Sequence, residues 1–136
     1  MKYLVDANIF LEAQLDQGKG EVCREFLAGL RDGDIEGVIT MFHADTVAIM
    51  MENKGVQGKI PGFMLSLYMY EGLEVFTLEL SGKAEAMMTD NGLSFDDSIA
   101  IQTMEELEIE KIVSYDDDFD SVKERLTPEE ALKNIT

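Results

Sequence analysis

The sequence predicts an α/β fold, a three-layer α/β/α sandwich with a central parallel β-sheet. Two observations predict it. Short apolar runs typical of buried strands alternate along the chain with segments whose apolar residues recur at helical spacing. Such alternation indicates strand–helix–strand units, in which the strands are parallel. The length of 136 residues, 46% of them hydrophobic, fits one domain over residues 1–136.

Four segments are predicted as strands because each is a short apolar run that ends at or near a polar residue. They are residues 2–6, 38–40, 74–80 and 112–115. The apolar residues are continuous within these runs and do not alternate with polar ones over a long stretch. This pattern predicts strands that are covered on both faces.

Seven segments are predicted as helices from their apolar spacing and their end signals. They are residues 9–15, 22–30, 42–51, 60–70, 84–88 and 97–107, with a last helix that begins after Thr127. Ser94 and Thr127 are expected to cap two of them, and Pro61 and Pro128 suit the first turn of a helix.

The composition is strongly acidic, with 28 acidic and 11 basic residues and a net charge of −17. Such a surface repels phosphate chains at long range, so a broad basic face for nucleic acid is excluded. The lone cysteine, Cys23, rules out an internal disulfide and is expected to be buried. No apolar run approaches the ~20 residues of a membrane span, and the N-terminal apolar run is too short for a signal peptide. A cytoplasmic protein without membrane contact is therefore expected.

Polar side chains follow three of the predicted strands. Asp6 and Asn8 come after the first strand, Thr40 ends the second, and Ser114 and Asp116 come at the end of the fourth. Ligands of open parallel sheets bind at the carboxyl ends of the strands. Oxygen ligands of this kind suit Mg²⁺ or Mn²⁺, and a cation relieves the repulsion between neighbouring carboxylates. The sequence therefore predicts a divalent-metal site at this edge.

Asp96 and Asp97 have two interpretations. Ser94-Phe95-Asp96-Asp97 resembles a capping box, in which the acids only stabilise the start of a helix. Alternatively, Phe95 anchors the two acids at the edge of the sheet, where they join the metal site.

The acids in the run at residues 116–120 are expected to have different roles. Asp117, Asp118 and Asp120 are expected to form a solvated turn. Asp116 is expected at the site because it follows a buried strand closely, and Phe119 needs an apolar pocket that would fix the turn.

Three blocks together resemble the PIN domain family, which includes the toxins of the virulence-associated protein C (VapC) type. They are Leu4–Phe10, with its strand and acid, Leu93–Ala100, with its acidic helix start, and Ile112–Phe119, with its hydroxyl-x-Asp-x-x-Phe pattern. Their order and spacing extend the resemblance over the whole chain.

The resemblance implies a PIN-like domain that hydrolyses RNA with Mg²⁺ or Mn²⁺. It assigns Asp6, Asp97 and Asp116 as metal-binding and catalytic acids, Asp96 as a weaker match, and Asn8 and Ser114 as supporting residues. Thr40 is added as a supporting residue because it ends the second strand. It also implies an RNA substrate, an antitoxin partner and a homodimer, for which residues Phe63, Leu67, Met69 and Tyr70 are a candidate face.

The sequence departs from the family at the helix after the second strand, which usually supplies a glutamate. Ala48 stands at that position. Asp45 and Glu52 lie on roughly the same helix face, and Asp45, nearer the strand end, is the candidate replacement. His43 is expected at the surface. Lys54 and Lys59, in a glycine-containing loop, are candidate nucleic-acid contacts.

Three other functions agree with parts of the sequence. Asp6-Ala7-Asn8 resembles the Asp-x-Asp signature of haloacid-dehalogenase-type phosphatases, but Asn8 breaks it. A phosphoacceptor receiver module would place paired acids after the first strand and a lysine after the last, and here Lys111 precedes its strand. A catalytically weakened PIN-like domain, acting as a binding or regulatory module, fits the missing glutamate and the acidic charge.

Overall fold

A parallel sheet forms the middle layer of the computed structural model, which describes residues 1–16, 18–89 and 91–135. Within those residues the sheet has five strands in the order β3-β2-β1-β4-β5, and every neighbouring pair is parallel. The strands are β1 Lys2–Val5, β2 Glu36–Thr40, β3 Leu73–Phe76, β4 Lys111–Val113 and β5 Glu124–Leu126. The predicted fold class, with helices on both faces of a parallel sheet, is confirmed.

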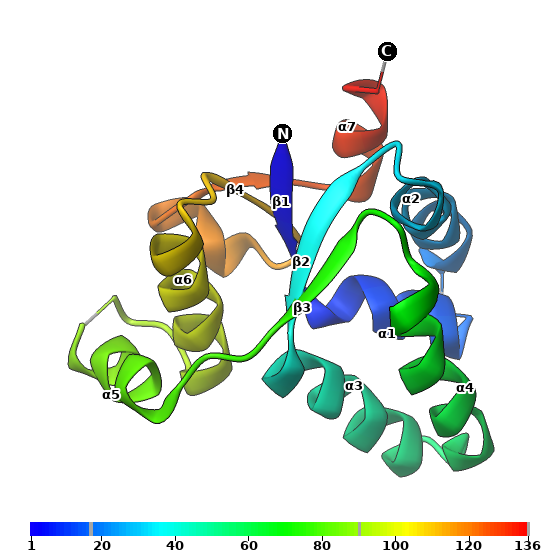
Figure 1. Ribbon diagram of the computed structural model, residues 1–136, viewed down its shortest axis with the longest axis horizontal. Helices are drawn as coiled ribbons and strands as arrows, with labels where there is room; N and C mark the ends of the chain where they lie inside the picture. Colours follow the sequence, from blue (N-terminus) through cyan, green and yellow to red (C-terminus); the bar gives the residue numbers. More distant parts are fainter. Residues whose placement is uncertain (17, 90, 136) are drawn as a thin grey trace.

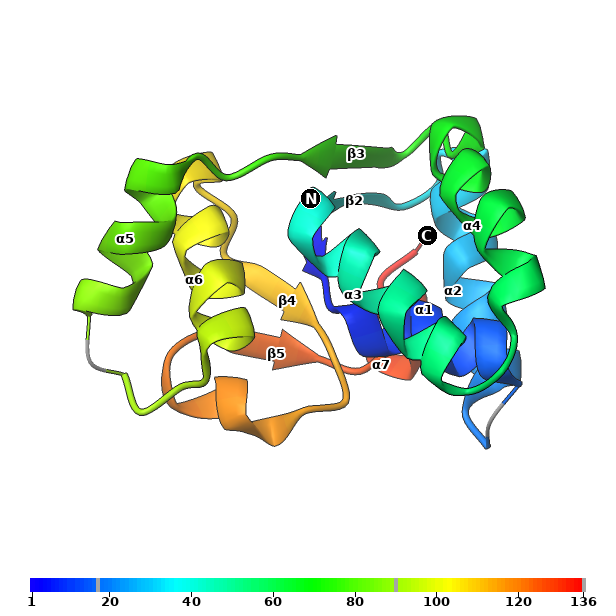
Figure 2. The same cartoon turned by 90° about the horizontal axis from the view of Figure 1, so that it is seen from below.

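The helices form the two outer layers (Figures 1 and 2). On one side lie α1 Ala7–Leu15, α2 Gly20–Asp32, α3 Met41–Asn53, α4 Ile60–Ser66 and α7 Pro128–Lys133, and on the other α5 Leu80–Met88 and α6 Phe95–Leu107. Short 3₁₀ turns are η1 Gln57–Lys59, η2 Leu67–Met69 and η3 Asp117–Ser121. No helix in the described part of the chain is long and apolar enough to cross a membrane.

Strand β1 shows why the two outer layers form. Tyr3 and Val5 belong to the core that packs against α1, α2 and α3, whereas Leu4 between them belongs to the core against α6. All three side chains are at most 5% exposed. Successive side chains of a strand point to opposite faces, so an apolar run can bury itself in two cores only when both faces are covered.

Two strand predictions were wrong at the edges of the sheet. The strand predicted over 74–80 ends at Phe76, because Leu78 packs outside the sheet against Ala86 and Ile99 and α5 begins at Leu80. Strand β5 was not predicted, since two of its three residues, Glu124 and Arg125, are charged. The helix predicted over 60–70 is divided between α4 and η2.

The sheet brings three chain segments to one edge. Strand β1 lies between β2 and β4, with Leu4 in register with both Val38 and Ile112. Asp6, which follows β1, donates its backbone N–H to the Val113 carbonyl at 3.0 Å. In Figure 1 the carboxyl ends of β1 and β2 point down, toward the starts of α3 and α6. The residues predicted to bind metal follow these strand ends or begin these helices.

Candidate functional site

The Ser114 hydroxyl connects the segments that follow β1 and β4. Its oxygen donates to Asp6 Oδ2 at 2.5 Å, across 108 positions of sequence, and accepts from the Asp116 backbone N–H at 2.9 Å. It also accepts from Asn8 Nδ2 at 3.3 Å. Ser114 is fully buried, so these bonds are shielded from water. The hydroxyl thus fixes Asp6 and Asp116 relative to each other.

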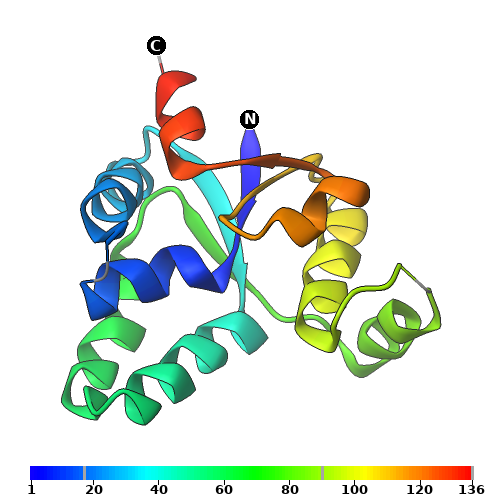
Figure 3. The ribbon, with the colours of Figure 1, turned by 180° about the vertical axis from the view of Figure 1, so that it is seen from behind.

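Asp116 also begins the turn η3. Its Oδ1 accepts from the Asp118 backbone N–H at 2.9 Å, and Phe119 is fully buried in the core beneath α6. Arg125 on β5 donates through Nε to Asp120 Oδ1 at 2.8 Å and through Nη1 to the Ser114 carbonyl at 3.1 Å. Figure 3 shows this orange segment beside α6. The turn η3, which carries the acids, is therefore fixed by the buried ring of Phe119 and by the guanidinium of Arg125.

The start of α6 combines the two interpretations that the sequence left open. The Ser94 hydroxyl caps the helix by accepting from the Asp97 N–H at 3.4 Å, and it donates to Asp96 Oδ1 at 2.6 Å. At the same time, one carboxylate oxygen each from Asp97, Asp116 and Asp118 lies within 4.8 Å of the others. Asp97 therefore lies at the cluster, while the carboxylate of Asp96 serves the cap.

The electrostatics place Asp6 in the same group of charges. Burial, together with the negative charges of Asp96, Asp6 and Asp116, raises the pKa of Asp97 to about 6, against the lowering effect of its hydrogen bond to Ser94. Burial also raises the pKa of Asp6, against the lowering effect of its bond from Ser114 and of His43. Since the charge of Asp6 raises the pKa of Asp97, the two carboxylates are near neighbours. We refer to Asp6, Asp97, Asp116 and Asp118 as the acidic cluster.

Asp118 was missed by the sequence analysis, which placed it in a solvated turn. Its side chain is exposed, as expected for such a turn, but its carboxylate faces Asp97 and Asp116. The path of η3 after the buried strand β4 determines the direction of the Asp118 carboxylate. No local signal in the acidic run distinguishes Asp118 from Asp117 or Asp120.

The predicted replacement for the family's glutamate lies elsewhere. Asp45 is exposed on α3 and is not among the charges that shift the pKa of Asp6 or Asp97. Glu52, Lys54 and Lys59 lie at the far end of α3 or beyond it. A helix of 13 residues is roughly 20 Å long, so these three residues are remote from the helix start where the acids gather.

The surface position expected for His43 was wrong, because its side chain is only 5% exposed. Thr40 caps α3 by accepting from the His43 N–H at 2.9 Å, and its hydroxyl also bonds to Nδ1 of the same histidine. The Nε2 atom lies 3.0 Å from the Asp96 carbonyl oxygen. Burial lowers the pKa of His43. The spacing of His43, Val47 and Met51, four residues apart on one buried helix face, is a sequence signal for this burial.

Asn8 has one further feature. Its Nδ2 is bonded to Ser114, whereas its Oδ1 is buried and has no hydrogen-bond partner among the described residues. A buried carbonyl oxygen without a donor is uncommon in folded proteins.

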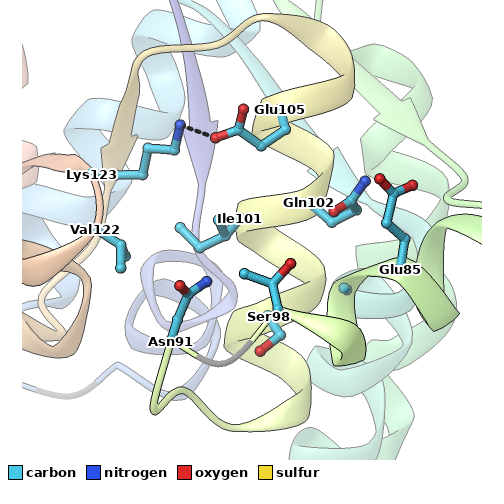
Figure 4. Close-up of a pocket in the computed structure, with 10 residues that line it drawn as sticks. Glu85, Asn91, Ser98, Ile101, Gln102, Glu105, Val122 and Lys123 are labelled. Carbon is cyan, nitrogen blue, oxygen red and sulfur yellow. Dashed lines mark hydrogen bonds and ion pairs between the residues drawn. The ribbon is translucent and has the colours of Figure 1, made fainter.

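A cavity of about 400 Å³ lies apart from the acidic cluster, between α5, α6 and the chain after η3 (Figure 4). The ion pair between Lys123 and Glu105, 2.5 Å long, crosses one end of it, and Ser98 and Gln102 lie along α6. None of Asp6, Asp97 and Asp116 lines it. This cavity and the acids are therefore in different places.

Comparison with known proteins identifies the family. The PIN domain profile matches residues 3–125. A search of the curated proteins returned no match.

Among solved structures, the fold is similar to the crystal structure of VapC20 from Mycobacterium tuberculosis, described as a sarcin–ricin loop cleaving toxin. The TM-score is 0.72 over 88% of this chain and 93% of that one, at 10% sequence identity. Identity this low supports a shared fold only. The profile match covers most of the sequence, and the chain belongs to the PIN domain family.

Proposed function

We propose that this protein is a divalent-metal-dependent endoribonuclease whose site is the acidic cluster. One observation carries the proposal: carboxylates from three remote segments gather at the carboxyl edge of the sheet, where Asp97, Asp116 and Asp118 have oxygens within 4.8 Å of one another and the Ser114 hydroxyl connects Asp6 to Asp116. Such a gathering is unfavourable for folding by itself, because like charges repel. It becomes favourable when a cation binds among the carboxylates.

The residues present fit Mg²⁺ or Mn²⁺. All the donors are oxygens, which these hard cations prefer. The buried Asn8 Oδ1 is a further oxygen near the Ser114 network that lacks a partner within the described residues. Asp97, Asp116 and Asp118, whose oxygens lie within 4.8 Å of one another, would hold the ion, and Asp6, which is bonded to Ser114, would add a fourth carboxylate. When bound, the cation would lower the pKa of a water molecule and neutralise charge on a phosphodiester.

The protein's own groups then orient the acids. The Ser114 hydroxyl donates to Oδ2 of Asp6 and so orients this carboxylate. The cap formed by Ser94 holds the first turn of α6, and with it Asp97. Each carboxylate is therefore positioned before a ligand binds, which reduces the cost of organising the site during the reaction.

RNA is the proposed substrate and an antitoxin protein the proposed partner, by analogy with the toxin whose fold this chain shares. A cytoplasmic location and a homodimer belong to the same proposal. Phe63 and Leu67 do not supply a dimer face, because both are buried in the core at 3% and 6% exposure. Exposed apolar side chains nearby are Leu65, Tyr68 and Met69.

A second candidate is a PIN-like domain that binds a partner and has lost most of its activity. The specific observation in its favour is α3, where Ala48 occupies the expected glutamate position and Asp45 lies away from the cluster. The net charge of −17 also disfavours tight RNA binding.

The experiment is cleavage of a mixed RNA pool with Mn²⁺ by the wild type, D6N, D97N and, as a matched control, E74Q at the opposite end of the sheet. The nuclease requires cutting by the wild type and E74Q that depends on Mn²⁺ and is lost in both aspartate variants. Equal cutting by all four proteins would indicate a contaminating nuclease and contradict the proposal. Binding of Mn²⁺ without any cutting would favour the second candidate.

A further inference from the structure

Helices α3 and α6 come from distant parts of the chain and begin beside each other at the carboxyl edge of the sheet (Figure 1). Two contacts join their first turns. The His43 Nε2 atom lies 3.0 Å from the Asp96 carbonyl oxygen, and the rings of Phe42 and Phe95 meet edge to face with centroids 5.5 Å apart. We refer to these two contacts as the α3–α6 joint.

We propose that His43 is a positioning residue for the metal site: through the Asp96 carbonyl it sets where Asp97 lies relative to Asp6. This inference rests on the proposed function and assigns a new residue to the same site. His43 itself does not touch substrate or metal. It acts through the backbone of the residue that precedes Asp97.

Hydrogen bonds occupy both ring nitrogens of His43. A carbonyl oxygen can only accept, so Nε2 carries the hydrogen that it donates to Asp96. The Thr40 hydroxyl, which accepts from the His43 backbone N–H, also bonds to Nδ1. A ring held at both nitrogens has a fixed orientation.

This connection complements the one made by Ser114. The Ser114 hydroxyl at the end of β4 fixes Asp6 and Asp116, but none of its bonds reaches α6. His43 links the end of β2, through Thr40, to the first turn of α6. Asp97 is thereby tied to the sheet from a second strand.

The aromatic contact alone cannot fix the position of Asp97 relative to Asp6. The Phe42–Phe95 pair keeps the two helix starts in contact, but Phe95 is 44% exposed and an edge-to-face pair allows the rings to slide. A hydrogen bond to a carbonyl is directional and fixes the angle of approach. The histidine is the element of the joint that can define a position to within the tolerance of a metal site.

The test uses two substitutions of His43 that differ in reach. In H43Q the side-chain amide can extend to where Nε2 lies and donate to Asp96, whereas in H43N it is too short. T46V is the control, because it removes a hydroxyl bond within α3, to the Phe42 carbonyl at 3.0 Å, and leaves the joint intact. Three measurements are made on each full-length protein: kcat and KM for Mn²⁺-dependent RNA cleavage, Mn²⁺ binding by the loss of the free-ion electron paramagnetic resonance signal, and Tm without metal.

The expected result for H43N is a fall in kcat on the order of tenfold, with Mn²⁺ binding weakened on the order of tenfold and KM for RNA little changed. H43Q should restore both quantities to within about threefold of wild type, and T46V should leave both unchanged. Losses that follow the fall in Tm equally in H43N and H43Q would show a purely structural residue and overturn the inference.

Failure of this inference and failure of the proposed function give different results. If the wild type binds Mn²⁺ and cleaves RNA while H43N does the same, only the role of His43 is overturned. If the wild type binds Mn²⁺ without cleavage and H43N loses that binding, the positioning role stands and the nuclease proposal fails. A wild type that neither binds Mn²⁺ nor cleaves RNA overturns both.

Discussion

The two ends of the sheet carry acids in opposite arrangements. At the amino ends of the strands, Glu74 pairs with Lys2 at 3.7 Å and Glu124 pairs with Lys111 at 3.6 Å. At the carboxyl ends, the acidic cluster includes three carboxylates with oxygens within 4.8 Å of one another. In the described part of the chain, no ion pair joins Asp6, Asp97 or Asp116 to a lysine or an arginine.

This difference shows that the overall charge of −17 does not explain the cluster. The chain places its few cations beside acids at the amino ends and on the outer helices, and it leaves the carboxyl ends uncompensated. Arg125 comes near, but it is bonded to Asp120 and to a backbone carbonyl. The missing counter-charge is local, and that distinguishes a site from an acidic surface.

The comparison is tested most strongly by removing one charge from each end. D116N should lower Mn²⁺-dependent RNA cleavage on the order of 100-fold, because it deletes a carboxylate of the cluster. E124Q, at the other end, should leave kcat/KM unchanged. Steady-state cleavage assays measure both. A D116N protein as active as E124Q would remove the distinction between the two ends.

Metal binding should stabilise the fold through the carboxyl end only. At a Mn²⁺ concentration 100 times the dissociation constant, the free energy of unfolding should rise by about 2.7 kcal/mol. Denaturant titrations with and without Mn²⁺ measure this gain. The gain should be strongly reduced in D97N and fully retained in E124Q. An equal gain in the two variants would mean that the ion binds elsewhere.

Without metal, the pH dependence of stability should reveal Asp97. Its pKa in the folded protein, about 6, lies above the ordinary 3.8, so the folded state binds this proton more tightly than the unfolded chain. The stabilisation is therefore complete below about pH 3.8 and is lost as pH rises through about 6. Allowing for solvent exposure, the loss is on the order of 1 kcal/mol.

Urea titrations of metal-free wild type and D97N between about pH 4 and about pH 7 measure this loss. The asparagine variant should lack that part of the pH dependence. Parallel pH profiles for the two proteins would contradict the assignment of the shift to Asp97.

The smallest effect is expected at the amino ends. Breaking the pair between Lys2 and Glu74, whose side chains are 43% and 51% exposed, should change the free energy of unfolding by less than about 1 kcal/mol. A double-mutant cycle of K2M and E74Q measures the coupling. A coupling well above that value would show that these acids are also part of a structured site.

The central strands could be predicted from the sequence, whereas the edge strand β3 was predicted with the wrong end and the edge strand β5 was not predicted. β1, β2 and β4 are buried on both faces, so each is a run of apolar residues such as Leu4 and Val5. β5 has a partner on one side only and includes Glu124 and Arg125. An edge strand needs less apolar surface, and the apolar pattern on which its prediction depends is then too short.

The residues of the site also differ in whether their positions could be predicted from the sequence. Asp6 and Asp116 follow directly from the ends of central strands, and their side chains lie at the predicted edge. The position of Asp118 depends on how η3 turns, and the contact of His43 with Asp96 depends on which helix packs against α3. Helical spacing indicates the burial of His43, but it does not contain either of these positions. The placement of Asp45 was guided by the family position of an absent glutamate, and the structure leaves it exposed on α3.

The hydrogen bond from Ser114 to Asp6 has a consequence for synthesis of the protein. The ribosome releases β1 first, but its neighbour β4 follows more than a hundred residues later. Parallel pairing between such distant segments is slow to form, since a long loop must close before any contact compensates for the lost entropy. The nascent chain therefore has no assembled acid site until the segment that carries β4 and Ser114 has been synthesised.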